Sequence, residues 1–456
     1  GVGDAFVARL GSDGAIEWCT YFGGAGRDAS VAIVPDGDRV WIGGTTNSTD
    51  LATTPDATQP ATGGGLDAFV TLLDSSQSGA SSLVWSSYLG GSASEGLFPS
   101  SIGSSTFDVD RLSLDVDASG RVAIVGSTLS ANFPTTPDAY QTSLSGGRDC
   151  FLTIVDPALS GASSLIWSTS FGGSGEEQAF EVRWLTDGTC AVAGTTVSSN
   201  FPVTPSAFQT SYGGGSFDGF VLRFDPSLDG AASLLASTFF GGSGDDSIVS
   251  MDGVSGTEVV VAGNSTAMTA TTPDAWFPSY PASSGFAGRV QIFDLALSGP
   301  DMLRFSSFLS GPGGSVMWGA DVNGATLTLA GWTAGDDFPL VNPFDGPAVD
   351  FLGAVAAQAT LSVSTDPQFR RGDTNDDAFI DIGDAIYGLS ILFSGATSHC
   401  ADAEDVNDDG NPDIADMIYL LGVLFVPGSP AIPAPMDCGV DPTPDGLDCA
   451  TSACVP

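Results

Sequence analysis

The chain has no lysine, and its one histidine is His399. A Schiff-base lysine, a P-loop lysine, a Ser-His-Asp triad and a histidine-ligated zinc in the N-terminal region are therefore excluded for this chain alone. Long apolar runs are missing too, so no membrane insertion is expected. No signal peptide is visible, and because residues 1–4 look like the interior of a repeat, we expect upstream residues to be missing or removed.

Positive charge is scarce: 12 arginines face 54 acidic residues, which gives a net charge of −42. Such a polyanion repels nucleic acid and anionic membranes, so neither is expected as a partner. It attracts divalent cations, or it keeps a secreted protein soluble. We assign most of the surface charge to solubility.

The seven cysteines divide by region. Four lie in the C-terminal tail: Cys400, Cys438, Cys449 and Cys454. Their density in a loop-rich segment predicts two disulfides, with three pairings possible, and an oxidising compartment. The protein is therefore expected to be extracellular or on a bacterial cell surface. Cys19, Cys150 and Cys190 are scattered and are expected to be buried thiols.

Repeated phrases occupy most of the chain. A phrase ending in Gly-Gly occurs at 18–24, 85–91, 167–173 and 236–242, and an Ala/Gly-Gly-Thr phrase occurs at 42–46, 125–128, 192–196, 261–265 and 329–333. A Pro-containing phrase occurs at 53–57, 133–139, 201–207 and 272–275, and an Asp-Ala-Phe-Val phrase occurs at 4–7, 67–70, 149–152 and 218–221. Phrases that recur in a fixed order predict a chain built of stacked structural units.

Each unit holds four short apolar runs bounded by Gly, Asp, Ser and Pro, which predicts four antiparallel strands. In the first complete unit we expect them at Ala29–Val34, Arg39–Thr45, Asp67–Leu73 and Leu83–Tyr88. A lone four-stranded sheet cannot bury both faces, so successive sheets must stack around an axis as propeller blades. The predicted fold class is a mostly β propeller followed by a small α-helical domain.

The phrases resemble the SBBP family of bacterial β-propeller repeats over about Gly3 to Ala356. The resemblance implies at least five blades, with an insertion around Ser100–Asp110 in the second unit. Two strands, Asp4–Leu10 and Ile16–Phe22, precede the first complete unit, and the fifth ends at Asp350–Val355 without a fourth strand. The N-terminal strands could complete the last blade, upstream repeats could add blades, or a neighbouring copy could donate strands and form a filament.

Acidic residues follow the Gly-Gly turns at Asp28, Glu95, Glu176, Glu177, Asp245 and Asp246. They could form a ring that binds a cation or a partner, or they could cap turns by accepting backbone N–H bonds. Capping is favoured, because nearly every unit has the feature and sites are usually local.

Two twelve-residue loops with oxygen-bearing residues at matching positions begin at Asp373 and Asp405. Calcium prefers six to eight such hard oxygens, so each loop predicts one calcium ion in an EF-hand-like arrangement. The expected ligands are Asp373, Asn375, Asp377, the Phe379 carbonyl, Asp381 and Asp384, and Asp405, Asn407, Asp409, the Asn411 carbonyl, Asp413 and Asp416. Each loop precedes a helix, with expected apolar faces of Ile386, Leu389 and Phe393, and of Ile418, Leu421 and Phe425.

The two loops and their helices resemble the duplicated F-hand of type I dockerins over Arg370–Phe425. The resemblance implies a calcium-dependent protein partner. Where cellulosomal dockerins carry hydroxyl residues that grasp cohesins, this chain has Ile382-Gly383 and Ile414-Ala415. These residues disfavour a cellulosomal cohesin as the partner. We expect a cohesin-like protein or another copy of the chain, with a homo-polymer possible. The expected domains are a propeller at 1–357, a linker at 358–369 and a dockerin-like domain with a Cys/Pro-rich tail at 370–456.

These features favour a non-enzymatic, calcium-binding scaffold or adhesion protein that assembles with other proteins. The alternative is a secreted carbohydrate-active enzyme or carbohydrate-binding propeller carried by a dockerin, since carboxylate pairs remain available. Catalysis is disfavoured because the acids recur with the repeat. Glu181 is the least repeat-like of them, and the nearby Arg183 is expected to pair with an acid at the surface.

Overall fold

A computed structural model describes residues 3–102, 105–280, 285–334, 338, 353–360, 370–375, 377, 379–398, 400–426, 428–433 and 447. The chain divides into two compact units, Gly1–Thr360 (unit 1) and Leu361–Pro456 (unit 2). Residues 361–369, which fall in the predicted linker, lie outside the described residues. None of the described helices is long and apolar enough to cross a membrane.

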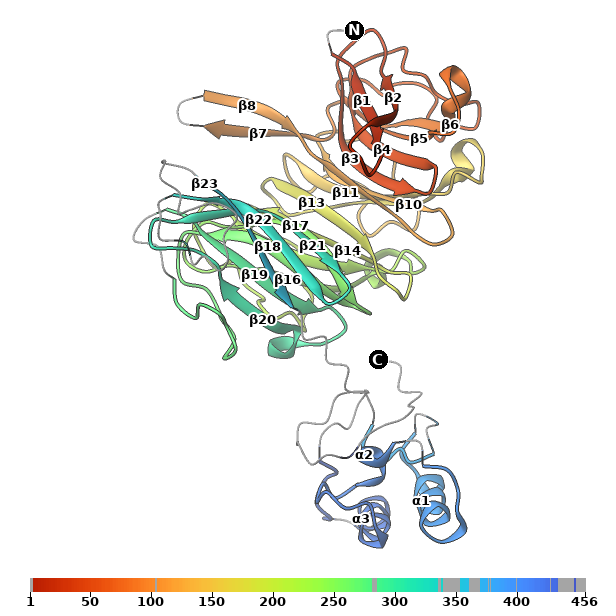
Figure 1. Cartoon of the computed structure of the whole chain (residues 1–456), viewed down its shortest axis with the longest axis vertical. Helices are drawn as coiled ribbons and strands as arrows, with labels where there is room; N and C mark the ends of the chain where they lie inside the picture. Colours follow the sequence, from red (N-terminus) through yellow and green to blue (C-terminus); the bar gives the residue numbers. More distant parts are fainter. Residues whose placement is uncertain are drawn as a thin grey trace. The chain divides into compact units, whose positions relative to one another are not determined.

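Unit 1 is a series of antiparallel sheets that follow one another in chain order (Figure 1). The four-stranded sheets are β3 (Asp28–Asp36), β4 (Arg39–Thr46), β5 (Asp67–Asp74) and β6 (Leu83–Leu89); β9 (Leu112–Val116), β10 (Val122–Thr128), β11 (Asp149–Val155) and β12 (Leu165–Phe171); β13 (Glu177–Trp184), β14 (Cys190–Thr196), β15 (Asp218–Phe224) and β16 (Leu234–Phe240); and β17 (Asp246–Ser255), β18 (Glu258–Ser265), β19 (Ala287–Asp294) and β20 (Leu303–Phe308). A three-stranded sheet follows, of β21 (Ser315–Asn323), β22 (Thr326–Thr333) and β23 (Gly353–Thr360).

The sheets are the blades of a β-propeller. The first strand of each contacts the first strand of the next, from β3 through β9, β13 and β17 to β21. Middle strands such as β5 and β11 are buried along almost their whole length, because a neighbouring sheet covers each face. The predicted mostly β, blade-built architecture is confirmed, and the four strands predicted for the first complete unit are all present.

A β-bulge interrupts the first strand of four blades, between Ser30 and Ala32, Ala179 and Glu181, Ile248 and Ser250, and Met317 and Gly319. The bulge brings a carbonyl oxygen of this strand against a glycine of the second strand. A side chain on Gly194, for example, would collide with the carbonyl oxygen of Gln178. This contact explains why the Ala/Gly-Gly-Thr phrase keeps its glycine.

The second blade is the exception. Its insertion is a hairpin of β7 (Leu97–Ile102) and β8 (Ser105–Asp110), which stands out from the sheets in Figure 1. The chain returns through Arg111, whose N–H donates to the Gly96 carbonyl, and enters β9 without a bulge. The predicted insertion is therefore present, and it directly precedes the innermost strand of the second blade, β9.

The N-terminal strands, β1 (Ala5–Leu10) and β2 (Ile16–Phe22), pair with each other as a half-blade. Among the described residues they form no ladder with the last blade, where β23 already occupies the third position. The half-blade leaves Phe6 and Tyr21 exposed, whereas the equivalent Phe69 and Tyr88 are buried. How the ring closes stays a prediction, and Asp350–Leu352 lie outside the described residues.

The scattered cysteines are free thiols in two environments. Cys150 and Cys190 are buried, as expected, but Cys19 is exposed, so that expectation is wrong for it. The equivalent Ser86 is covered by the Pro-containing loop of its own blade, through a hydrogen bond from the Thr54 N–H to the Ser86 carbonyl. No described segment covers Cys19 in this way.

Unit 2 contains the helices α1 (Ile382–Ser394), α2 (Ala401–Glu404) and α3 (Ile414–Phe425). Asp381 and Asp413 cap α1 and α3 in matching capping boxes, in which each accepts from the backbone while Asp384 or Asp416 accepts in return. Cys400 is disulfide-bonded, and its partner lies outside the described residues, as do His399 and most of the tail. The described part of the tail packs back on the helices through the buried Ile432.

The apolar faces predicted for the two long helices contact the core of unit 2 only in part, through Leu389 and Leu421. Ile386 and Phe393 on α1 are 59% and 71% exposed, and Ile418 and Phe425 on α3 are similarly exposed. The helices meet instead through small and flexible residues, because Gly388 lies directly against Met417. The larger residues follow a helical period, but on the outer surface.

Candidate functional site

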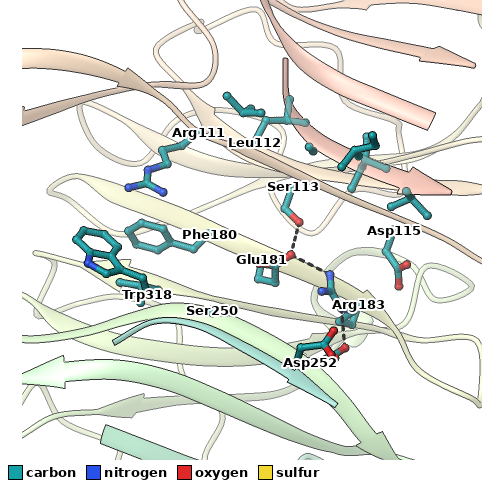
Figure 2. A pocket seen from close by; sticks show the side chains of 17 residues that line it. Arg111, Leu112, Ser113, Asp115, Phe180, Glu181, Arg183, Ser250, Asp252 and Trp318 are labelled. Carbon is teal, nitrogen blue, oxygen red and sulfur yellow. Dashed lines mark hydrogen bonds and ion pairs between the residues drawn. The ribbon is translucent and has the colours of Figure 1, made fainter. Parts of the chain in front are cut away.

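The innermost strands of the five blades surround one cavity of about 710 Å³. Its walls come from β3, β9, β13, β17 and β21, so both the first and the last complete blade contribute (Figure 2). This volume falls in the range of small-molecule sites in proteins, roughly 300 to 1,000 Å³. The propeller axis is therefore the place where unit 1 can hold a ligand.

The cavity is where the repeat breaks down. Two positions on the innermost strands align across the blades, and neither holds the same residue in all five. The first holds Ala32, Ser113, Glu181, Ser250 and Gly319, and the second holds Val34, Asp115, Arg183, Asp252 and Asp321. All of these except Gly319 line the cavity. Variation at equivalent positions gives this site a chemistry that no single blade has.

Glu181 is at the centre of a polar network in the cavity (Figure 2). Its Oε1 accepts hydrogen bonds from Ser113 Oγ at 2.7 Å and from Arg183 Nη1 at 2.8 Å. Burial raises the pKa of the Glu181 carboxyl, and the Arg183 charge offsets part of that effect. Glu181 therefore holds its proton to a higher pH than an ordinary glutamate.

Arg183 also reaches Asp252, with Nε 3.0 Å from Oδ1. The remaining oxygen of Asp252 accepts from the Val322 N–H of the next innermost strand at 2.7 Å. Asp115 accepts from the Trp184 N–H in the same way, also at 2.7 Å. These two aspartates hold neighbouring strands together, and Arg183 is confirmed to pair with acids, although inside the cavity and not at the surface.

The other side of the cavity is aromatic and cationic. Figure 2 shows Arg111, Phe180 and Trp318 gathered there. The Arg111 guanidinium carbon is 5.3 Å from the centroid of the Phe180 ring. Trp318 is 53% exposed although it lines the cavity, so its ring is available to a ligand.

Of these cavity residues, the sequence pointed only to Glu181 and its neighbour Arg183. Asp252, Arg111 and Trp318 were missed because the innermost strands carry none of the repeated phrases. The signal that could have found them is the second-strand phrase, since its pairing aligns the innermost strands and exposes their differences.

The acids after the Gly-Gly turns act as turn caps. Asp28 accepts from the Gly24 N–H at 2.8 Å, Glu177 from the Gly173 N–H at 3.1 Å, and Asp246 from the Gly242 N–H at 2.7 Å. Each is almost fully buried. Capping was the favoured interpretation, and these bonds agree with it.

Buried aspartates of the Asp-Ala-Phe-Val phrase lie next to these caps. Asp67 and Glu95 both face Gly90, so their carboxyl groups lie close together. Burial raises the pKa of Glu95 to about 8. At the equivalent junction between the blades of β15 and β17, Arg289 lies 3.1 Å from Asp246 and supplies a positive charge.

The two loops of unit 2 that were predicted to bind calcium are rich in side-chain oxygens. Among the described residues, no three acidic, histidine or cysteine side chains converge as a metal site. Many loop oxygens instead accept backbone N–H bonds, as Asp384 Oδ1 does from Thr374 at 2.9 Å. Asn407 Oδ1, at the third loop position, is buried without a hydrogen-bond partner, which suits a ligand oxygen awaiting a hard cation.

Comparisons with known proteins give a fold-level likeness only. No protein-family model matches the chain. No curated protein matches it either. A family 43 β-1,3-galactosidase solved with galactodeoxynojirimycin is similar at 8% identity and a TM-score of 0.29, covering 72% of this chain and 89% of its own.

Two further solved structures are similar to a comparable degree. A family 43 β-xylosidase/α-arabinofuranosidase from a compost metagenome is 7% identical, with a TM-score of 0.25 over 75% of this chain and 91% of its own. Levansucrase from Bacillus subtilis is 8% identical, with a TM-score of 0.27 over 66% of this chain and 78% of its own. At these scores the matches assign no activity.

The expectation of a non-enzymatic protein is corrected. The solved structures similar to this chain include glycoside hydrolases, which are enzymes, whereas the sequence led us to expect a protein without enzymatic activity. The physical premise was also wrong. The buried acids after the Gly-Gly turns cap those turns, whereas Glu181 lines the central cavity at a position where the other blades have alanine, serine or glycine.

Proposed function

We propose that unit 1 is a carbohydrate-active propeller that binds a sugar in its central cavity. The observation that carries the proposal is Glu181, a half-buried carboxyl of raised pKa in a cavity that also presents an exposed tryptophan. Carboxyl groups perform acid and base steps in glycoside hydrolysis, and neither lysine nor histidine is needed.

Glu181 is the candidate general acid, because its raised pKa keeps it protonated where an ordinary glutamate is ionised. Asp321 is the candidate base, since it is exposed and lines the same cavity. Asp252 is less suited because both of its oxygens already accept hydrogen bonds. Arg183 would then hold Glu181 in position.

The test is hydrolysis of a panel of plant and microbial polysaccharides by the full chain and by Glu181→Gln. We expect activity that falls by about a hundredfold or more in the variant, the usual scale for loss of a general acid. The matched control is Glu258→Gln, because Glu258 is also half-buried, of raised pKa and near an arginine, but lies outside the cavity.

The pH profile adds a second readout. If Glu181 must be protonated, activity should persist above the pH at which an ordinary glutamate ionises and then decline. Full activity in Glu181→Gln, or no turnover and no binding of any glycan on the panel, would refute the proposal.

We further propose that unit 2 binds two calcium ions and contacts another protein. The support is the duplicated oxygen pattern and the buried Asn407 Oδ1. Exposed apolar residues also occur at matching places on the two long helices: Ile382, Ile386 and Phe393 on α1, and Ile414, Ile418 and Phe425 on α3. The ions would order the loops that begin these helices.

A further inference from the structure

We propose that the central cavity recognises a uronic acid residue, whose carboxylate is bound by Arg111. This inference rests on the proposed sugar-binding function and names the class of sugar. It starts from the guanidinium of Arg111, which pairs with no described carboxylate although the protein is strongly acidic.

Arg111 makes no ion pair with any described carboxylate, and its Nε is buried without a hydrogen-bond partner. Burial also lowers the pKa of its guanidinium. A desolvated guanidinium without a partner costs free energy that a bound anion would recover.

Other arginines of the chain do find carboxylates. The ion pairs are Arg9 with Asp38, Arg121 with Asp117, Arg148 with Glu176, Arg183 with Asp252, Arg223 with Asp187, Arg289 with Asp246, Arg304 with Glu258 and Arg371 with Asp408. With 54 acidic residues for 12 arginines, carboxylates are abundant. Among the described side chains, the lack of one at Arg111 therefore favours a place that a ligand anion can occupy.

The surroundings of Arg111 define the ligand further. Phe180 and Trp318 offer ring faces on the same side of the cavity, which suit the C–H face of a sugar. Glu181 and Asp321 on the other walls would repel a second negative charge. A single carboxylate next to a sugar ring fits this distribution, because a guanidinium binds a carboxylate through two parallel hydrogen bonds.

The orientation follows from the same charges. With its carboxylate at Arg111, a uronate would direct its glycosidic oxygen towards Glu181, which lines the same cavity. The site would thus select the acidic sugar and place the bond next to the candidate acid.

The experiment measures binding of the full chain to oligosaccharide pairs by calorimetry at physiological salt, so that the net charge of −42 is screened. Trimers rich in galacturonate, glucuronate or mannuronate are compared with the same trimers after reduction of their carboxyl groups. A sulfated neutral trimer tests the other source of a sugar-borne anion. The variants are Arg111→Met, Arg111→Lys and, as control, Arg121→Met.

Arg121 is a close match for Arg111, because its guanidinium also lies over an aromatic ring, 4.9 Å from the Trp184 centroid, but it pairs with Asp117 outside the cavity. We expect at least one acidic trimer to bind about ten- to a hundredfold more tightly than its reduced form, as for hydrogen bonds to charged groups. Arg111→Met should remove that preference, so that the variant binds the acidic trimer no more tightly than the reduced one. Arg111→Lys should restore it in part, and Arg121→Met should retain it.

Equal binding of acidic and reduced trimers, or a preference that survives in Arg111→Met, overturns the inference while the proposed function stands. If Arg111 is needed for binding of the sulfated trimer alone, the group that it binds is a sulfate ester, and the uronic-acid inference is also overturned. Absence of binding to every trimer counts against both this inference and the proposed function.

Discussion

Buried carboxyl groups are placed at the blade junctions in pairs, and one pair shows how they are tolerated. Glu95 has no exposed surface and accepts from Thr128 Oγ1 at 2.9 Å. Its neighbour Asp67 accepts from the Gly63 N–H at 2.8 Å. Because burial raises the pKa of Glu95 to about 8, Glu95 keeps its proton at neutral pH, and two adjacent negative charges are avoided.

The raised pKa of Glu95 predicts how the stability of the wild type and of Glu95→Gln should differ with pH. An ordinary glutamate releases its proton near pH 4.5, whereas Glu95 releases it near 8 in the folded chain. The stability that protonated Glu95 contributes is complete below pH 4.5 and is lost as pH rises to about 8. Across that window the wild type should lose about 1.4 kcal/mol per pH unit relative to the variant.

Denaturant unfolding followed by tryptophan fluorescence measures the difference. Glu176→Gln is the control, since Glu176 is an exposed acid in an equivalent turn. A stability difference between wild type and Glu95→Gln that does not change with pH would show that no proton is held there.

At the scale of elements, the innermost-strand bulge dictates the second-strand glycine. Gly194→Ala should destabilise unit 1 by about 1–3 kcal/mol or more, because the new methyl group meets a backbone carbonyl that cannot move without breaking the ladder. Gly126→Ala should cost clearly less. In that blade the bulge is absent, and the nearest atom is a Phe151 ring carbon at 2.9 Å, which can shift.

Thermal unfolding of the two variants side by side tests this. Equal destabilisation by Gly194→Ala and Gly126→Ala would mean that the bulge does not determine the glycine.

The loops of unit 2 give a prediction about calcium. Chelation should lower the melting temperature of unit 2, because the carboxylates of each loop then repel one another. Asp405→Asn should reduce the number of calcium ions bound per full chain from two to one. Calorimetry measures the number, and Asp402→Asn serves as control, since Asp402 is a buried acid outside both loops. Binding of no calcium by the wild type would end the calcium proposal.

The sequence predicted elements well where it repeats. The strands of the first complete unit were predicted to within two residues of their observed ends, because turn residues bound each phrase. Asp67, for example, is the first residue of its phrase and also the first residue of β5. The predicted apolar faces of α1 and α3 are not the faces through which the two helices meet. Ala385, Gly388 and Met417 form that contact. Small residues carry little weight in an apolar pattern, although they allow the closest helix approach.

At the scale of the whole molecule, the candidate site could not be read from local patterns. Arg111, Glu181 and Trp318 belong to different blades and become neighbours only through the arrangement of blades around the axis. Glu181 stood out as an exception to the repeat, but its partners lie in strands without a phrase. How the propeller closes and whether copies assemble stay predictions, which light scattering with and without chelator would test.

The central claim is that a sugar binds at the propeller axis, and the most direct test uses two exposed tryptophans. Trp318 is 53% exposed in the cavity, whereas Trp276 is 40% exposed outside it. The measurement is affinity electrophoresis of the full chain in gels containing each polysaccharide of the panel. We predict that Trp318→Ala weakens retardation by about tenfold, since loss of an aromatic contact costs about 1.4 kcal/mol or more, and that Trp276→Ala leaves it unchanged. Retardation that is equal in wild type and Trp318→Ala, or that is lost in Trp276→Ala instead, would contradict the account.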